Sequence, residues 1–113
     1  MPVYEDGLIG RDVIHVDDVV AAIMACLNAK DGEDHLLDVG TGVETTILDA
    51  ATAIAEINGA PAPQICGKFR DGDVRSAVAD VTDLTAATGV KPAITFTEGA
   101  KRVGDWLVSS GHV

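Results

Sequence analysis

Short apolar runs that suit β-strands alternate along this chain with segments whose apolar residues recur at helical spacing. Such an alternation is typical of an α/β fold, in which helices pack against a small sheet. We therefore predict a small mixed or parallel sheet with about four helices. The chain has 113 residues, enough for one hydrophobic core and too few for two. Residues 1–113 are predicted to be a single domain unit.

The predicted helices have recognisable starts and ends. Thr46 with Asp49, and Thr95 with Glu98, form pairs of the capping-box type. Glycines that follow the apolar pattern, at positions 59 and 89, are typical of helix C-termini. The helices are expected to begin at Asp17 or Asp18, Thr46, Asp80 and Thr95, and to end near residues 28, 58, 89 and 107. The strands are expected at residues 12–16, 35–39, 64–69 and 74–78.

The charge of the chain excludes some classes of partner. Eighteen acidic residues against eight basic ones give a net charge of -10, which argues against nucleic acid and against an anionic membrane surface. No apolar run approaches the roughly 20 residues of a membrane helix, and the first residues do not resemble a secretion signal. Cys26 and Cys66 lie in apolar patterns, so we expect buried free thiols and a cytoplasmic protein, although a disulfide between them stays open.

Gly40-Thr41-Gly42 follows one predicted strand and precedes a predicted helix, as a dinucleotide-binding turn would. The dinucleotide fingerprint needs a third glycine where Thr45 stands, and an acidic residue at the end of the next strand. Neither is present, so we interpret this segment as a tight strand-to-helix turn and predict no cofactor site.

The sequence offers no catalytic or metal-binding set. No Gly-x-Ser-x-Gly nucleophile elbow is present. The residues that could be imagined as metal ligands have spacings that match no standard metal site. These residues are His15, Asp17, Asp18, His35 and Asp38.

Basic residues are scarce but clustered. Lys68, Arg70 and Arg75 fall within one eight-residue window, and Arg11 follows a glycine near the start of the chain. The planar guanidinium fork of arginine matches phosphate oxygens, so such a cluster in an acidic chain indicates an anion site. The composition alone favours the alternative, a solvated loop with salt bridges.

Five segments, in this order, are similar to the C-terminal part of a known family. The chain resembles the extended short-chain dehydrogenase/reductase family, which comprises NAD-dependent nucleotide-sugar epimerases and dehydratases. The similarity is strongest at Arg11–Val20, with the sequence RDVIHVDDVV, and at Gly67–Arg75, with the sequence GKFRDGDVR. The other three segments are Pro2–Gly7, Asp80–Pro92 and Thr97–Leu107.

The resemblance implies a nucleoside-diphosphate-sugar site. By that resemblance, Arg11 and Arg70 would hold the diphosphate, and Asp73 would support the ribose or orient Arg70. The backbone around Pro2 and Tyr4 would contact the base. Arg75 is expected instead to form an ion pair with Asp71 or Asp73.

The family's catalytic parts lie upstream of the matching region. They are a glycine-rich turn that binds NAD and a Tyr-x-x-x-Lys pair. Tyr4 is the only tyrosine here, and position 8, where the paired lysine would stand, is Leu8. Since hydride transfer needs a cofactor held close to the substrate, we expect no cofactor and no catalytic residue in this chain. We interpret the chain as a truncated, partial domain that is inert alone and has weak affinity for nucleotide sugars.

Two other functions remain open. The chain is either an interaction or scaffold module with a vestigial pocket, or half of a split enzyme completed in trans by a cofactor-binding chain. By the resemblance, the first predicted helix, at residues 19–27, and the first predicted strand, at 12–16, would pack against the cofactor domain in the intact family. Their apolar faces would be uncovered here, so we predict a homodimer or a higher oligomer.

Overall fold

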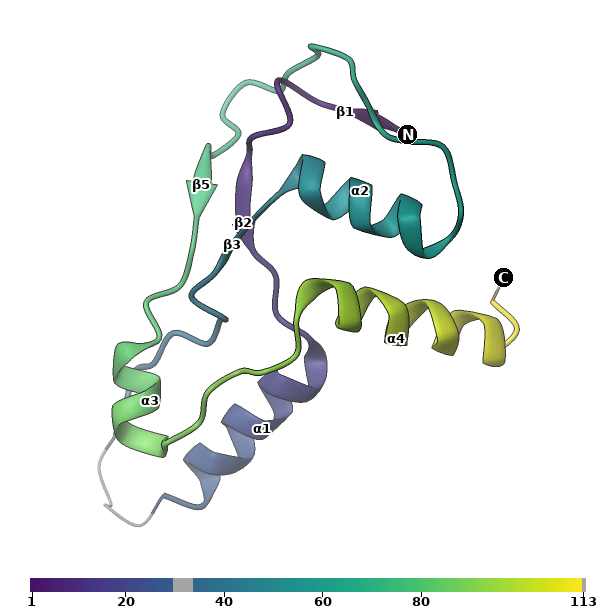
Figure 1. The fold of residues 1–113 in the computed structure, drawn as a ribbon. Helices are drawn as coiled ribbons and strands as arrows, with labels where there is room; N and C mark the ends of the chain where they lie inside the picture. The colour runs from purple at the N-terminus through teal and green to yellow at the C-terminus, as the bar shows by residue number, and fades with distance from the viewer. Residues whose placement is uncertain (30–33, 113) are drawn as a thin grey trace.

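The computed structural model describes residues 1–29 and 34–112, and it has the predicted α/β architecture (Figure 1). Its described part holds four helices and two small sheets. The helices are α1 (Val16–Leu27), α2 (Ile47–Ile57), α3 (Thr82–Thr88) and α4 (Phe96–Ser109). The strands are β1 (Pro2–Val3), β2 (Gly10–Asp12), β3 (Glu44–Thr46), β4 (Gln64–Ile65) and β5 (Ser76–Ala77).

The sheets are mixed and very short. In the larger sheet, with strand order β3-β2-β5, the central strand β2 runs antiparallel to β3 and parallel to β5. In the smaller sheet, β1 pairs in parallel with β4. Strands far apart in the sequence therefore place the start of the chain beside residues 64–77. This is the region that carries the two segments with the strongest family resemblance.

Local turn chemistry confirms most of the predicted helix ends. Thr46 and Thr95 cap α2 and α4, where each side-chain oxygen accepts a hydrogen bond from the amide three residues on. Gly59 and Gly89 adopt left-handed conformations, with φ of 60° and 72°, where α2 and α3 end. These contacts lie within one turn of the chain, so the sequence alone is enough to predict them.

The start of α1 differs from the prediction. His15, not Asp17 or Asp18, is the N-cap, because its Nδ1 accepts a hydrogen bond from the Asp17 amide at 3.1 Å. The helix therefore begins at Val16, and the predicted strand at residues 12–16 is wrong beyond Asp12. At α3, the Asp80 carboxylate accepts from the Thr82 amide at 3.0 Å, although the cap residue itself is Val81.

Three other predictions about local structure are wrong or too long. Residues 34–39 form no strand, and the strands predicted at 64–69 and 74–78 are reduced to two residues each. A strand needs a neighbouring strand to pair with, and no strand of the described chain pairs with residues 34–39. Cys26 and Cys66 are free, as expected, but both are exposed rather than buried.

The molecule is open, and its core is small. Its radius of gyration is 16.7 Å, whereas a compact domain of this length has about 13 Å. Its accessible surface is 7674 Å², which exceeds by about 1,800 Å² the value for a compact monomer of this mass. The described buried apolar core consists of Val3, Ile9, Ala22, Ala51, Ala55 and Leu84. No described helix has the length and apolar character needed to cross a membrane.

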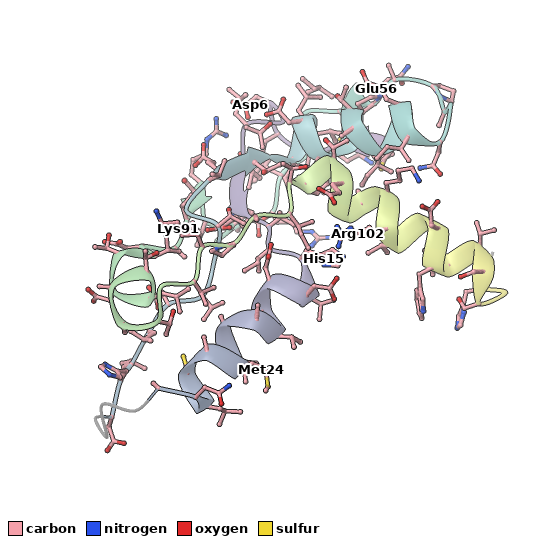
Figure 2. All side chains as sticks on the ribbon, turned by 60° about the horizontal axis from the view of Figure 1, so that its bottom comes forward. Asp6, His15, Met24, Glu56, Lys91 and Arg102 are labelled. Carbon is pink, nitrogen blue, oxygen red and sulfur yellow. The ribbon has the colours of Figure 1, made fainter. Side chains whose placement is uncertain are left out.

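The helices meet in two pairs. α2 packs against α4, and α1 packs against α3. Figure 1 shows α1 pointing away from the α2–α4 pair, so that its far side faces no other helix or strand of the described chain. The two pairs meet where α1 and α4 begin: Arg102 of α4 pairs with Asp17 at 3.4 Å, close to His15 (Figure 2). A Cβ on Gly99 of α4 would lie 3.0 Å from the His15 ring, so a larger residue there would require the ring to shift slightly.

Candidate functional site

The residues predicted to bind a nucleotide sugar lie in two neighbouring places. Pro2 lies on β1, Tyr4 follows it, and Arg70 and Asp73 belong to the loop that leads to β5. Arg11 lies on β2, in the other sheet, where it pairs with Ala77 of β5. The Gly10 amide donates to the Arg75 carbonyl at 2.9 Å, so this loop ends directly beside the strand that carries Arg11.

Tyr4 and Arg70 are brought together. The Glu5 amide donates to the Lys68 carbonyl at 2.7 Å, which extends the β1–β4 pairing toward the loop. The Arg70 guanidinium then lies 5.6 Å from the centre of the Tyr4 ring, in cation–π contact. Asp73 closes the loop, since its amide donates to the Arg70 carbonyl at 3.3 Å. The described contacts of Asp73 do not include an ion pair with Arg70.

Arg75 forms ion pairs, but not with the predicted partners. Its guanidinium contacts Glu5 at 3.0 Å and Asp6 at 2.7 Å, not Asp71 or Asp73. Hydrogen bonds from Arg75 and from the Leu8 amide lower the pKa of Asp6 to about 2. Two carboxylates therefore neutralise Arg75, and these carboxylates lie about seventy positions away in the sequence.

Arg11 and Arg70 have no carboxylate partner among residues 1–29 and 34–112. The half-buried Arg11 side chain donates only to the Gly10 carbonyl, at 2.7 Å. Arg70 is exposed and makes the ring contact with Tyr4. Lys68 and Lys91 are likewise without an ion pair in this part of the chain, whereas Lys101 and Arg102 are paired with acids. In a chain with more than twice as many acids as bases, this leaves the positive charge of Arg11, Lys68 and Arg70 available to an anion.

Asp12 is the site residue that sequence reasoning missed. Its carboxylate accepts hydrogen bonds from the Thr41 amide and hydroxyl at 2.8 and 2.6 Å, and from the Gly42 amide at 2.8 Å. A fourth, longer bond of 3.3 Å comes from the Ala79 amide. Partial burial would raise the pKa of Asp12, but these hydrogen bonds outweigh it and lower the pKa below 3.8.

These bonds explain the Gly40-Thr41-Gly42 turn. Its amides donate to Asp12 of the same chain, so they are not directed at a cofactor phosphate. A Cβ on Gly40 would lie 2.5 Å from the Asp12 carboxylate, and Gly42 has a φ of 72°. The sequence holds only a distant signal for this contact, an acidic residue on a strand and a Gly-Thr-Gly turn 29 and 30 positions later.

Exposed apolar side chains occur along much of the described chain, and one group of them lies on α1 and on the segment after it. Val16, Val20, Ile23, Met24 and Leu27 of α1 are between 51 and 74% exposed, and Leu36 is fully exposed. A second apolar region is a groove of about 790 Å³, lined in part by Ile54, Ile57, Phe96, Val103 and Leu107. Surfaces of this kind are typical of contact with another protein segment.

Comparison with known proteins identifies relatives of the whole chain. No family model matches it. It is 43% identical over 107 residues to dTDP-L-rhamnose 4-epimerase from Burkholderia thailandensis, covering 95% of this chain and 30% of that protein. It is 36% identical over 105 residues to UDP-glucose 4-epimerase from Mycolicibacterium smegmatis, covering 93% of this chain and 33% of the relative.

A solved structure has the same fold at similar coverage. MoeE5, in complex with UDP-glucuronic acid and NAD, superposes with a TM-score of 0.84 and 32% sequence identity. The match covers 97% of this chain and 37% of MoeE5. The chain thus spans about a third of the length of the proteins that it matches.

Proposed function

Because this chain is homologous to a part of the NAD-dependent sugar epimerases and dehydratases, we propose that it is their C-terminal, substrate-binding part. In this proposal it binds a nucleoside diphosphate sugar and does not perform the family's reaction alone. Arg11 and Arg70 hold the diphosphate, Asp73 supports the ribose or orients Arg70, and the backbone at Pro2 and Tyr4 contacts the base.

The observation that carries this proposal is the contrast between Arg75 and two other arginines, Arg11 and Arg70. Arg75 is neutralised by Glu5 and Asp6, whereas Arg11 and Arg70 have no carboxylate partner in the described residues. An arginine without a carboxylate can meet a diphosphate without first breaking an ion pair. A paired arginine must lose that pair, which offsets its attraction for phosphate.

The surroundings of Arg70 suit a nucleotide. The Tyr4 ring supports the guanidinium from one side, which restricts its motion and keeps its donors available on the others. The loop that carries Arg70 is joined to β2 through the bond from Gly10 to Arg75. The named relatives act on dTDP and UDP sugars, and MoeE5 is bound to UDP-glucuronic acid, which supports this class of ligand.

The reaction itself needs groups that this sequence does not contain. Tyr4 is the only tyrosine, and it contacts Arg70 rather than a lysine. The Gly-Thr-Gly turn donates to Asp12, so it is not a nicotinamide-dinucleotide site. We therefore assign binding to this chain, and we assign hydride and proton transfer to the catalytic half of the enzyme.

Calorimetric titration with UDP-glucose, dTDP-glucose and NAD tests the proposal. We expect saturable binding of at least one nucleotide sugar and no binding of NAD. Arg70→Ala and Arg11→Ala should each weaken binding of the nucleotide sugar by about tenfold or more, because each removes a charge-assisted contact. Lys91→Ala is the matched control, because it also removes a positive charge without an ion pair in the described chain. Lys91 lies apart from the proposed site, whose position Asp6, the partner of Arg75, marks in Figure 2.

The control separates specific contacts from general charge. If Lys91→Ala weakens binding as much as Arg70→Ala does, the ligand responds only to net charge and the assigned contacts are wrong. Absence of binding for every nucleotide sugar would overturn the proposal for this chain.

The exposed apolar face of α1 favours a second role, in binding another protein segment. Its five exposed apolar side chains and Leu36 account for part of the excess surface of the molecule. The catalytic half of a split enzyme, or a partner protein of an interaction module, could bind to this surface. In the isolated chain, a second copy of the chain would bind there. The predicted homodimer would cover it by burying about 800 Å² per partner, well within the excess surface.

A further inference from the structure

We infer that Asp12 is a positioning residue of the nucleotide-sugar site: its contact with the Gly40-Thr41-Gly42 turn and Ala79 fixes the strand that presents Arg11. This inference rests on the proposed function, because it concerns the arginine that would hold the diphosphate. Asp12 follows Arg11 directly on β2. Successive side chains of a strand point to opposite faces of the sheet. A contact that holds Asp12 on one face therefore also fixes the direction of the Arg11 side chain on the other face.

The contact ties together three separate segments. The Asp12 carboxylate joins β2 to the turn at residues 40–42, which leads to β3, and to Ala79, which follows β5. β5 is preceded by the loop that holds Arg70, and its residues Ser76 and Ala77 pair with Gly10 and Arg11. The two unpaired arginines therefore lie on segments that Asp12 connects at one end.

Sheet pairing alone is too weak to fix this arrangement. β5 has two residues and β2 has three, so few ladder hydrogen bonds hold them in register. A carboxylate with three short bonds and a fourth at 3.3 Å adds charge-assisted contacts at the end of this ladder. These bonds restrain the direction of β2 where its pairing ends.

The turn has the shape that a carboxylate needs. Gly40 allows the Asp12 oxygens to approach to a distance at which a Cβ would clash, and Gly42 provides the left-handed conformation. Thr41 contributes both its amide and its hydroxyl. The turn therefore binds the Asp12 carboxylate. This contact gives a role to the Gly-Thr-Gly motif, which the proposed ligand contacts do not use.

Charge and position predict opposite effects of removing this carboxylate. A negative charge next to Arg11 weakens the attraction of the site for a diphosphate, so its removal by itself would tighten binding. If Asp12 positions Arg11, its removal weakens binding instead. The sign of the change therefore separates positioning from through-space electrostatics.

The test is a double-mutant cycle on the whole 113-residue chain, with UDP-glucose as the titrated probe. Asp12→Asn and Arg11→Ala should each raise the dissociation constant about tenfold, and the double variant should bind no more than about twofold more weakly than Arg11→Ala. Glu56→Gln is the charge control, because Glu56 is exposed and its side chain makes no hydrogen bond or ion pair within the described chain. Its affinity should stay within about twofold of the unmodified chain.

A spectroscopic readout follows the guanidinium itself. The Arg11 side-chain Nε–Hε resonance should shift when UDP-glucose binds to the unmodified chain, and this shift should shrink in Asp12→Asn. If Asp12→Asn does not fold, Thr41→Val replaces it, since that change removes one donor and keeps the carboxylate. Thr41→Val should weaken binding about threefold, whereas Thr41→Ser, which retains the hydroxyl, should bind like the unmodified chain.

The outcomes separate the two proposals. Additive losses in the double variant, or tighter binding by Asp12→Asn, would overturn the positioning role and leave the diphosphate site intact. A folded Thr41→Val variant with unchanged affinity would also overturn it. If the unmodified chain binds neither UDP-glucose nor another nucleotide sugar, both the proposed binding site and the positioning role of Asp12 are wrong.

Discussion

The two sides of α1 differ in what covers them. On one side, Ala22 is fully buried where α1 packs against α3, whose Leu84 is also fully buried. On the opposite side, Val20, Ile23 and Leu27 are at least half exposed. A helix that is apolar on both sides is built to be buried on both sides. The described chain covers one of them, so we propose the other as a surface for a further protein segment.

The largest expected effect comes from a change on the covered side. Leu84→Ala removes a fully buried side chain and should lower the free energy of unfolding by about 3 kcal/mol. Leu36→Ala is the same substitution at a fully exposed position and should change it by less than about 0.5 kcal/mol. Urea denaturation of the two variants measures the difference. Equal losses would mean that Leu36 is covered in solution, and the contrast between covered and exposed apolar side chains would fail.

Acid should destabilise the fold through its carboxylates, because protonation weakens the hydrogen bonds and ion pairs that they form. Hydrogen bonds lower the pKa of Asp6 to about 2 and the pKa values of Asp12 and Asp80 below 3.8. A carboxylate with a lowered pKa stabilises the fold above its unfolded value, and this contribution is lost as the pH falls through the folded value. Stability should therefore be nearly constant from pH 7 to about 5 and should fall below about pH 4.

Urea denaturation at several pH values checks this prediction, and Asp12→Asn should show a shallower fall. If the variant and the unmodified chain lose stability in parallel, the contact between Asp12 and the Gly-Thr-Gly turn does not contribute.

A small effect on stability is also expected on the uncovered side of α1. Replacing both Ile23 and Leu27 by serine should change the free energy of unfolding by less than about 1 kcal/mol, because both side chains are exposed. The same change should shift the chain toward the monomer in sedimentation velocity. If the unmodified chain is already monomeric at micromolar concentration, this face does not mediate self-association.

The elements that the sequence predicted well are those with local causes. The caps at Thr46 and Thr95 and the left-handed glycines at 59 and 89 depend on residues within one helical turn. The alternation of apolar patterns led correctly to the α/β fold, and the family resemblance led correctly to the homologous proteins. The start of α1 was missed because a histidine is an uncommon cap.

The features that were not predicted depend on distant residues. The partners of Arg75 lie about seventy positions upstream, and the Asp12 carboxylate is bound by a turn 29 and 30 positions later. The sequence 35–39 has the composition of a strand, but no neighbouring strand pairs with it in the described chain. Composition indicates what a segment tends to form, and the available partners decide whether it forms.

The central claim is that Arg11 and Arg70 recognise the diphosphate of a nucleotide sugar. The most direct measurement is calorimetric titration of the unmodified chain with UDP-glucose and, separately, with uridine, which has the same base and ribose but no diphosphate. The account predicts saturable binding of UDP-glucose and affinity for uridine that is lower by about a hundredfold, because two charge-assisted contacts are lost. Equal affinity for the two ligands, or no binding of UDP-glucose, would contradict it.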